Sequence, residues 1–213
     1  MVSFRTVLVA LGAALLFQGA CAAQGGGTKT LHPGNLRGVS LVDVQQRAYP
    51  LFNKLKENRA TVLVWWSSSC PCVARYRGRV EALRKSYVGK SVAFLAVASN
   101  ADDARQDFGQ NDKLWSLPLI IDKGGKLAAL LGVGSTPTTA ILDQRAQLRY
   151  YGWLDNERKP GEAGRVAYLD SALRQVLAGN TVSRVETPVY GCRISRSLGE
   201  PSSCSETCGK TKK

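Results

Sequence analysis

The stretch that decides the fold is Thr61-Val-Leu-Val-Trp-Trp-Ser-Ser-Ser-Cys-Pro-Cys-Val-Ala-Arg-Tyr76. It begins with an apolar run of β-branched and aromatic residues, Val62 to Trp66. Such a run predicts a strand that is buried on both faces, as in a parallel or mixed sheet covered by helices. Three serines then interrupt the apolar run, and Cys72 to Tyr87 has the apolar spacing of a helix. The stretch therefore predicts a central strand, a short polar loop and a helix.

Cys70 lies where the predicted loop meets the predicted helix. The free N–H groups and the dipole of a helix N-terminus stabilise an anion, and Arg75, Arg77 and Arg79 add positive charge nearby. A thiolate is the reactive form of cysteine and is favoured in such a place. Cys70 is therefore the candidate nucleophile.

Cys72 is the candidate resolving thiol that lies nearest in sequence. A disulfide between Cys70 and Cys72 would close a very small ring, and strained disulfides are more oxidising than relaxed ones. This spacing favours dithiol oxidase or isomerase chemistry over strong reduction. The alternative is that Cys72 is a buried helix residue that faces away from Cys70.

The segment Trp66-Ser-Ser-Ser-Cys-Pro-Cys72 resembles the active-site segment of thioredoxin-fold proteins, which usually carry Trp-x-x-x-Cys-x-x-Cys. Here Val73 stands where that family has its second cysteine. Ser135 to Asp143 resembles the family's cis-proline loop with the strand that follows it, and Gly191-Cys-Arg-Ile194 resembles the end of redoxins related to alkyl hydroperoxide reductase and thiol-specific antioxidant proteins. The resemblance covers about residues 36–195, and the chain is identified as an exported redoxin of this family.

The resemblance also implies how the site is built. Pro137, which follows Thr136, is expected to be a cis-proline that faces Cys70, in a loop whose backbone pairs with an extended substrate segment. Thr136, Pro71 and Trp66 are accordingly assigned to substrate binding, with Trp66 shielding the site, although Trp66 and its neighbour Trp65 fit the core equally well.

Cys192 is open to two interpretations. It is either a second resolving thiol that reaches Cys70 when the C-terminal segment folds over the site, or a structural cysteine.

The succession of apolar patterns predicts the α/β class, with a thioredoxin-like mixed sheet that has helices on both faces. Helices are expected at residues 49–58, 72–87, 102–108, 126–131 and 166–178, with Asp102 or Asp103 capping the third and Gly179 ending the last. Strands are expected at residues 36–44, 62–66, 91–98, 117–121, 138–142 and 148–153.

The first 22 residues have the pattern of an export signal. A basic start precedes an apolar run, Thr6 to Phe17, that is too short to span a bilayer comfortably, and Ala20-Cys-Ala22 offers a cleavage site. The alternative is a lipid anchor on Cys21. Residues 23–35 are expected to be a linker, 36–195 the redoxin domain and 196–213 a basic, flexible tail with cysteines.

The charge of the chain says little about its partners. The formal net charge is +13, but there is no zinc-finger spacing and no arginine-rich helix with interleaved aromatics, so nucleic-acid binding is poorly supported. In an exported protein such a surface meets anionic lipid or cell-wall polymer, or simply keeps the protein soluble.

The six cysteines of the chain indicate an oxidising compartment. Cys204 and Cys208 are separated by three residues, and this short spacing favours a local disulfide in the tail. The sole histidine, His32, lies in the linker, so neither a metal site nor a cofactor is expected.

Three functions are compatible with these residues. The first is a cell-envelope thiol–disulfide oxidoreductase that acts on protein thiols or disulfides with a redox partner protein. The second is a thiol peroxidase, for which Ser67 stands where peroxiredoxins place a hydroxyl, although Leu63 replaces their proline. The third is a redoxin-like binding module without enzymatic activity, for instance for Cu(I) through thiolates.

Overall fold

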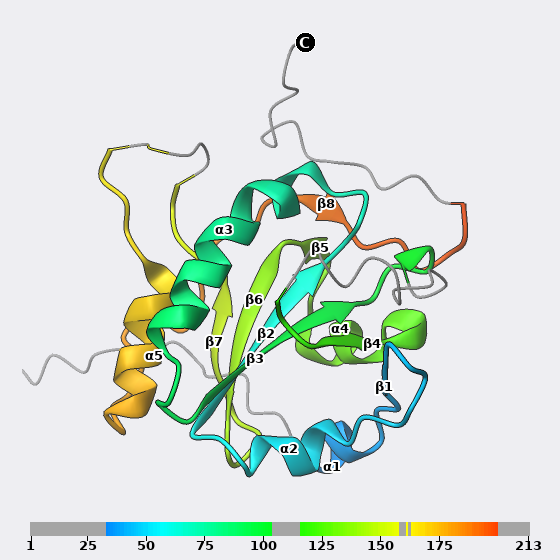
Figure 1. Ribbon diagram of the computed structural model, residues 1–213, viewed down its shortest axis with the longest axis horizontal. Helices are drawn as coiled ribbons and strands as arrows, with labels where there is room; N and C mark the ends of the chain where they lie inside the picture. Colours follow the sequence, from blue (N-terminus) through cyan, green and yellow to red (C-terminus); the bar gives the residue numbers. More distant parts are fainter. Residues whose placement is uncertain (1–32, 104–115, 158–160, 162, 200–213) are drawn as a thin grey trace, which may run out of the picture.

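A six-stranded sheet runs through the molecule in the order β1-β4-β3-β2-β6-β7. The computed structural model describes residues 33–103, 116–157, 161 and 163–199 (Figure 1). The strands of this sheet are β1 (Val42–Asp43), β2 (Ala60–Trp66), β3 (Val92–Ala98), β4 (Leu119–Ile121), β6 (Thr138–Asp143) and β7 (Leu148–Gly152). A separate pair consists of β5 (Ser135–Thr136) and β8 (Cys192–Arg193).

The sheet is mixed, as the sequence predicts. Strand β2 runs parallel to β3, which runs parallel to β4. On the other side β2 is antiparallel to β6, which forms a hairpin with β7. The predicted central strand is therefore confirmed, because β2 lies between β3 and β6 and all seven of its residues are buried.

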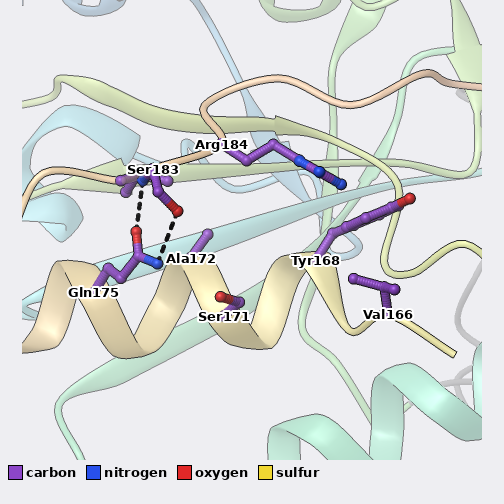
Figure 2. Close-up of a pocket in the computed structure, with 8 residues that line it drawn as sticks. Val166, Tyr168, Ser171, Ala172, Gln175, Ser183 and Arg184 are labelled. Carbon is purple, nitrogen blue, oxygen red and sulfur yellow. Dashed lines mark hydrogen bonds between the residues drawn. The ribbon is translucent and has the colours of Figure 1, made fainter. Parts of the chain in front are cut away.

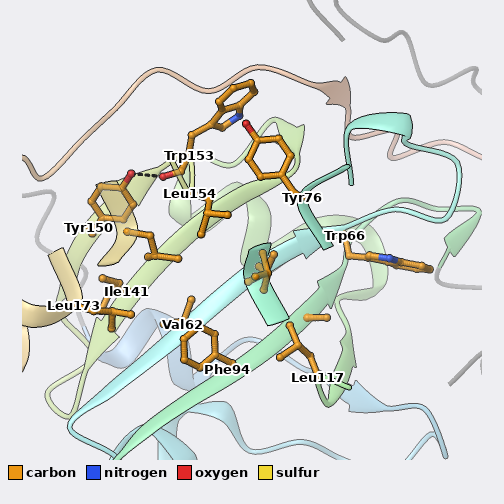
Figure 3. Close-up of a cluster of buried hydrophobic side chains, with 14 of the residues drawn as sticks. Val62, Trp66, Tyr76, Phe94, Leu117, Ile141, Tyr150, Trp153, Leu154 and Leu173 are labelled. Atoms are coloured by element: carbon orange, nitrogen blue, oxygen red, sulfur yellow. Dashed lines mark hydrogen bonds between the residues drawn. The ribbon is translucent and has the colours of Figure 1, made fainter. Parts of the chain in front are cut away.

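Helices cover both faces of the sheet (Figure 1). Successive residues of a strand point to opposite faces, so Val62 and Val64 join one core while Leu63 and Trp65 join the other. The first core, part of which is drawn in Figure 3, is closed by α3 (Pro71–Ser86) and α5 (Tyr168–Leu177). The second core is closed by α1 (Pro33–Arg37), α2 (Leu51–Leu55) and α4 (Lys126–Leu131), the last preceded by the 3-10 turn η3 (Lys123–Gly125).

One predicted strand is wrong in most of its length. Residues 36–44 were expected to be extended, but Leu36 lies in α1 and only Val42–Asp43 forms a strand. The carboxylate of Asp43 accepts hydrogen bonds from the backbone N–H groups of Gln45 and Arg47, at 2.9 Å each, and this turn ends the strand.

Several predictions fall partly or wholly on residues that the structure does not describe. These are the signal segment, most of the linker, the helix at 102–108 beyond Asp103, and Cys204 and Cys208 of the tail. Within the described ranges, no helix has the length and apolar character that crossing a membrane requires. The remaining predicted helices and strands are present with shifts of a few residues at their ends, and Gly179 ends α5 with a φ of 75°.

Three buried tyrosines should make the fold sensitive to alkali. Burial raises the pKa of Tyr76, Tyr87 and Tyr150 above the usual value of about 10. The unfolded chain releases these protons first as the pH rises, so their contribution to stability is complete below pH ~10 and is lost above it. We expect tyrosinate formation at these three residues, followed through the NMR signals of their rings, to coincide with loss of the circular dichroism signal. Tyrosinate formation at these residues near pH ~10 in a chain that stays folded would contradict this.

Candidate functional site

Cys70 lies at the N-terminal end of α3, as predicted. It is the N-cap residue, in an extended conformation with φ −88° and ψ 110°, and Pro71 occupies the first turn of the helix. Pro71 is exposed, whereas the Cys70 side chain is buried, with 3% of its surface accessible. Because the first N–H groups of a helix have no partner within it, the sulfur lies at the positive end of the α3 dipole.

The cis-proline loop lies against Cys70. The bond between Thr136 and Pro137 is cis, which confirms the prediction for Pro137. The Cys70 thiol donates a hydrogen bond to the carbonyl oxygen of Thr136, with a distance of 3.2 Å from Sγ to oxygen. The fold therefore brings two segments that are far apart in sequence to the same sulfur atom.

The three cysteines of the described region differ in oxidation state. Cys70 is a free thiol, while Cys72 and Cys192 are each disulfide-bonded. Cys72 and Cys192 are buried, with 3% and 0% of their surfaces accessible. Cys70 is therefore the group able to start thiol chemistry in this state, and no strained ring between Cys70 and Cys72 is present.

A C-terminal strap, which we define as residues 191–195, lies along the cis-proline loop. Cys192 pairs directly with Thr136, and Ile194 N donates to the carbonyl oxygen of Gly134 at 2.9 Å. Gly191 has a φ of 137°, and a Cβ atom there would lie 2.0 Å from the Thr136 carbonyl oxygen. Only glycine permits this close approach, so the strap is fitted to the loop beside Cys70.

The two tryptophans of β2 point to opposite faces of the sheet. Trp66 belongs to the same core as Cys70 and Cys72. Trp65 is fully buried on the other face, where its Nε1 donates to the Ser99 hydroxyl at 3.1 Å. Trp66 is therefore the tryptophan on the side of the reactive thiol.

A partly buried polar network ties the strap to the loop that precedes Cys70. The Asp103 carboxylate accepts hydrogen bonds from Ser68, through N at 3.0 Å and Oγ at 2.6 Å. Its other oxygen accepts from Asn100 Nδ2 at 2.9 Å, and Asn100 Oδ1 accepts from Ser195 N at 2.9 Å. The Asp103 carboxylate thus joins three segments around the site, while the helix that Asp102 or Asp103 was expected to cap lies outside the described residues beyond Asp103.

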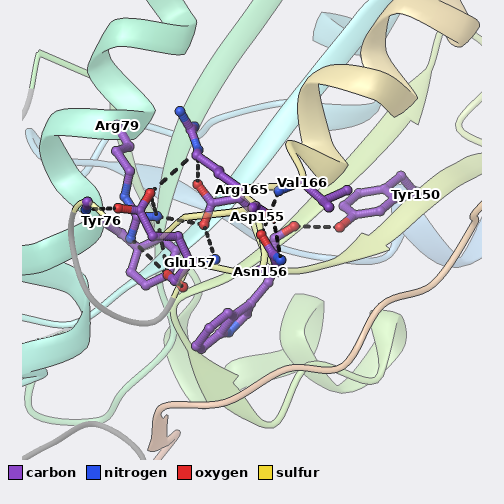
Figure 4. A network of polar contacts seen from close by, with 11 residues as sticks. Tyr76, Arg79, Tyr150, Asp155, Asn156, Glu157, Arg165 and Val166 are labelled. Atoms are coloured by element: carbon purple, nitrogen blue, oxygen red, sulfur yellow. Dashed lines mark hydrogen bonds and ion pairs between the residues drawn. The ribbon is translucent and has the colours of Figure 1, made fainter.

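A second network fixes α3, the helix that carries Cys70, to the segment after β7 (Figure 4). Arg79 Nη1 contacts Asp155 at 2.6 Å and Glu157 at 3.0 Å, and Arg165 Nε contacts Asp155 at 2.9 Å. Tyr76 donates from its hydroxyl to the Glu157 carbonyl oxygen at 3.2 Å. No sequence pattern indicates this network, because its members follow no local spacing.

The cavities described here do not include Cys70. One of about 180 Å³ lies between α5 and the segment after it, where Gln175 and Ser183 exchange hydrogen bonds (Figure 2). Another, of about 420 Å³, is lined by Thr61 at the opposite end of β2 from Cys70. Within the described ranges no three metal-binding side chains cluster.

The sequence matches the AhpC/TSA family over residues 38–151, more than half of the chain. A curated relative is the thiol-disulfide oxidoreductase ResA of Halalkalibacterium halodurans, which is 25% identical over 92 residues. That alignment covers 43% of this chain and 52% of the relative, so the chain spans about half the length of the curated relative it matches.

Two solved structures share the fold. A hypothetical protein from Sinorhizobium meliloti 1021 has a TM-score of 0.64 and 26% identity, over 75% of this chain and 91% of its own. An uncharacterized conserved protein from Geobacillus kaustophilus has a TM-score of 0.67 and 23% identity, over 81% and 93%. The predicted thioredoxin-like fold is confirmed.

Proposed function

Because this chain belongs to the AhpC/TSA family, we propose that it is a thiol–disulfide oxidoreductase of the cell envelope in which Cys70 is the nucleophile. The observation that carries the proposal is the free Cys70 thiol at the N-terminus of α3, with Sγ 3.2 Å from the Thr136 carbonyl oxygen. The likeness to a thiol-disulfide oxidoreductase, ResA, supports the same reaction class.

In the proposed reaction the Cys70 thiolate attacks one sulfur of a protein disulfide. The substrate S–S bond breaks, one substrate thiolate leaves, and a mixed disulfide joins Cys70 to the substrate. Cys72 or Cys192 then attacks the Cys70 sulfur and releases the second substrate thiol. Since both candidates are disulfide-bonded here, a dithiol of a redox partner protein must first reduce the resolving cysteine.

The residues around Cys70 take supporting roles in this proposal. Thr136 and Pro137 form the surface against which the substrate disulfide lies, and Pro71 provides an exposed edge next to the thiol. Trp66 belongs to the same buried core as Cys70 and shields the site.

We further propose that residues 36–195 form the catalytic domain and that the chain is exported through its first 22 residues. Cleavage with release and a lipid anchor on Cys21 are the two outcomes of that export. The basic surface then faces anionic lipid or cell-wall polymer. The N-terminal residue of the mature protein, determined by mass spectrometry, distinguishes the two outcomes.

The experiment must distinguish disulfide exchange from peroxidase activity, which is the alternative function. The Ser67 hydroxyl lies 3.2 Å from the Ser69 hydroxyl, whereas Cys70 Sγ donates to the Thr136 carbonyl oxygen, which cannot donate a hydrogen bond to a peroxide. We therefore expect the reduced protein to react faster with a protein disulfide than with hydrogen peroxide. Measuring both second-order rate constants by stopped flow tests this expectation.

A faster reaction with hydrogen peroxide, with sulfenic acid formed at Cys70, would assign the peroxidase function instead. Reaction with neither oxidant, together with stoichiometric Cu(I) after anaerobic purification, would assign the binding-module function. The same protein preparation serves for all three measurements.

A further inference from the structure

The strap occupies the strand edge at which Cys70 would meet an extended peptide. We infer that the strap is a built-in competitor of protein substrates, and that it must leave the cis-proline loop before Cys70 reacts with a disulfide in an extended chain. This inference rests on the proposed function of Cys70, to which it adds a form of regulation.

The position of Cys70 fixes where a substrate must lie. Because Cys70 Sγ contacts the Thr136 carbonyl oxygen, a disulfide that reaches this sulfur has to pass along Thr136. Extended peptides bind such an edge through main-chain hydrogen bonds, as an added strand. Neighbouring strands lie about 4.8 Å apart, so this edge has room for a single strand, and Cys192 is already paired with Thr136 there.

The strap leaves one polar group at this strand edge without a hydrogen bond. The Thr136 hydroxyl is buried, and within the described ranges it makes no hydrogen bond. An unpaired buried hydroxyl is unfavourable, and a peptide that offers this group a partner would regain the lost hydrogen bond. The strap is therefore a displaceable occupant of the edge.

The network of Ser68, Asp103 and Asn100 holds the strap at its far end. Ser195 donates its N–H to Asn100 Oδ1, and its carbonyl oxygen accepts from Ala101 N at 2.9 Å. Removing one member of this network leaves the polar groups of the others without their partners, which is unfavourable where they are buried. Loss of Asn100 should therefore weaken the attachment of the strap at this end.

The disulfide at Cys192 is a covalent restraint on the same strap. A dithiol reductant breaks this S–S bond: Cys192 and its bonded sulfur each take up an electron and a proton, and the two thiols of the reductant become a disulfide. Reduction should then favour the released strap. The reduced protein would thereby accept extended substrates that the oxidised protein excludes.

The test compares two second-order rate constants for mixed-disulfide formation at Cys70. One substrate is an extended peptide with an internal disulfide, and the other is oxidised glutathione. Gly191→Ala adds a Cβ atom 2.0 Å from the Thr136 carbonyl oxygen, far closer than atoms can pack, and so pushes the strap away. The ratio of the peptide rate to the glutathione rate should rise about tenfold or more, the order expected when a few hydrogen bonds of the strap are lost.

A matched control is Gly89→Ala, at an exposed glycine with a φ of 76° and nothing within 4 Å of the added Cβ. This substitution also forces an alanine into a positive φ, but far from the strap, so it should leave the ratio of the two rates unchanged. Asn100→Ala releases the other end of the strap and should raise the ratio in the same way. The wild-type protein can also be reduced with dithiothreitol, which is removed before the assay. This sample tests release of the strap without any substitution.

A ratio that stays constant in the folded variants and in the reduced wild-type protein, while both substrates react, would overturn the inference and leave the proposed function intact. If Cys70 reacts with neither substrate in any of the proteins, the proposed function fails and the inference falls with it. Circular dichroism of each variant identifies the folded proteins to which the comparison applies.

Discussion

Cys70→Ser should lower the rate of disulfide exchange to the background level, a loss on the order of a thousandfold or more. A serine hydroxyl has nearly the shape of the thiol and can still donate to the Thr136 carbonyl oxygen, so the fold should be retained. It forms no disulfide, however, and the first covalent step is lost. Insulin reduction or oxidative refolding of a reduced protein measures the rate.

The resolving cysteine is identified by the same assay with the other serine variants. If Cys72 resolves the mixed disulfide, Cys72→Ser should trap the adduct at Cys70, and if Cys192 does, Cys192→Ser should trap it. A Cys70→Ser protein that turns over at the wild-type rate would remove Cys70 from the mechanism. An alanine at exposed Arg193, on the outer side of the strap, serves as the control that should keep its activity.

The largest effect on stability is expected from Asp155→Ala. The Asp155 side chain is fully buried and binds Arg79, Arg165 and the backbone N–H of Glu157. Without Asp155, the mostly buried Arg79 side chain keeps one carboxylate partner, Glu157, where it had two. Loss of one member of a buried ion network costs about 3–5 kcal/mol, so the free energy of unfolding in urea should fall by that amount.

The pair of Lys54 and Glu57 provides the contrast, because it has a similar distance of 2.9 Å but side chains that are 45% and 58% exposed. Glu57→Ala should change the free energy of unfolding by less than about 1 kcal/mol. Equal effects of the two substitutions would show that burial does not decide the contribution of the Asp155 network.

The sequence predicted the part of the site that depends on local patterns. A continuous apolar run gave β2, and the change to helical spacing placed Cys70 at the start of α3. The cis state of Pro137 came from the resemblance to a family and not from the residues themselves, because an isolated Thr-Pro pair is rarely cis.

Contacts between distant segments could not be predicted in the same way. Strands β5 and β8 have two residues each, too few for any periodicity, and their pairing is decided by the close approach of Gly191 to Thr136. In the sequence, Asp102 or Asp103 was a candidate helix cap, and nothing there indicated the hydrogen bonds that Asp103 accepts from Ser68, 35 residues earlier in the chain.

The role of Cys70 is tested most directly by identifying the sulfur that receives the substrate. The reduced protein is mixed with a protein disulfide, quenched with acid within one turnover, digested and analysed by mass spectrometry. We predict that the substrate cysteine is linked to Cys70, at highest yield in whichever of Cys72→Ser and Cys192→Ser lacks the resolving thiol. A substrate linked to another cysteine, with Cys70 still a thiol, would contradict the proposed mechanism.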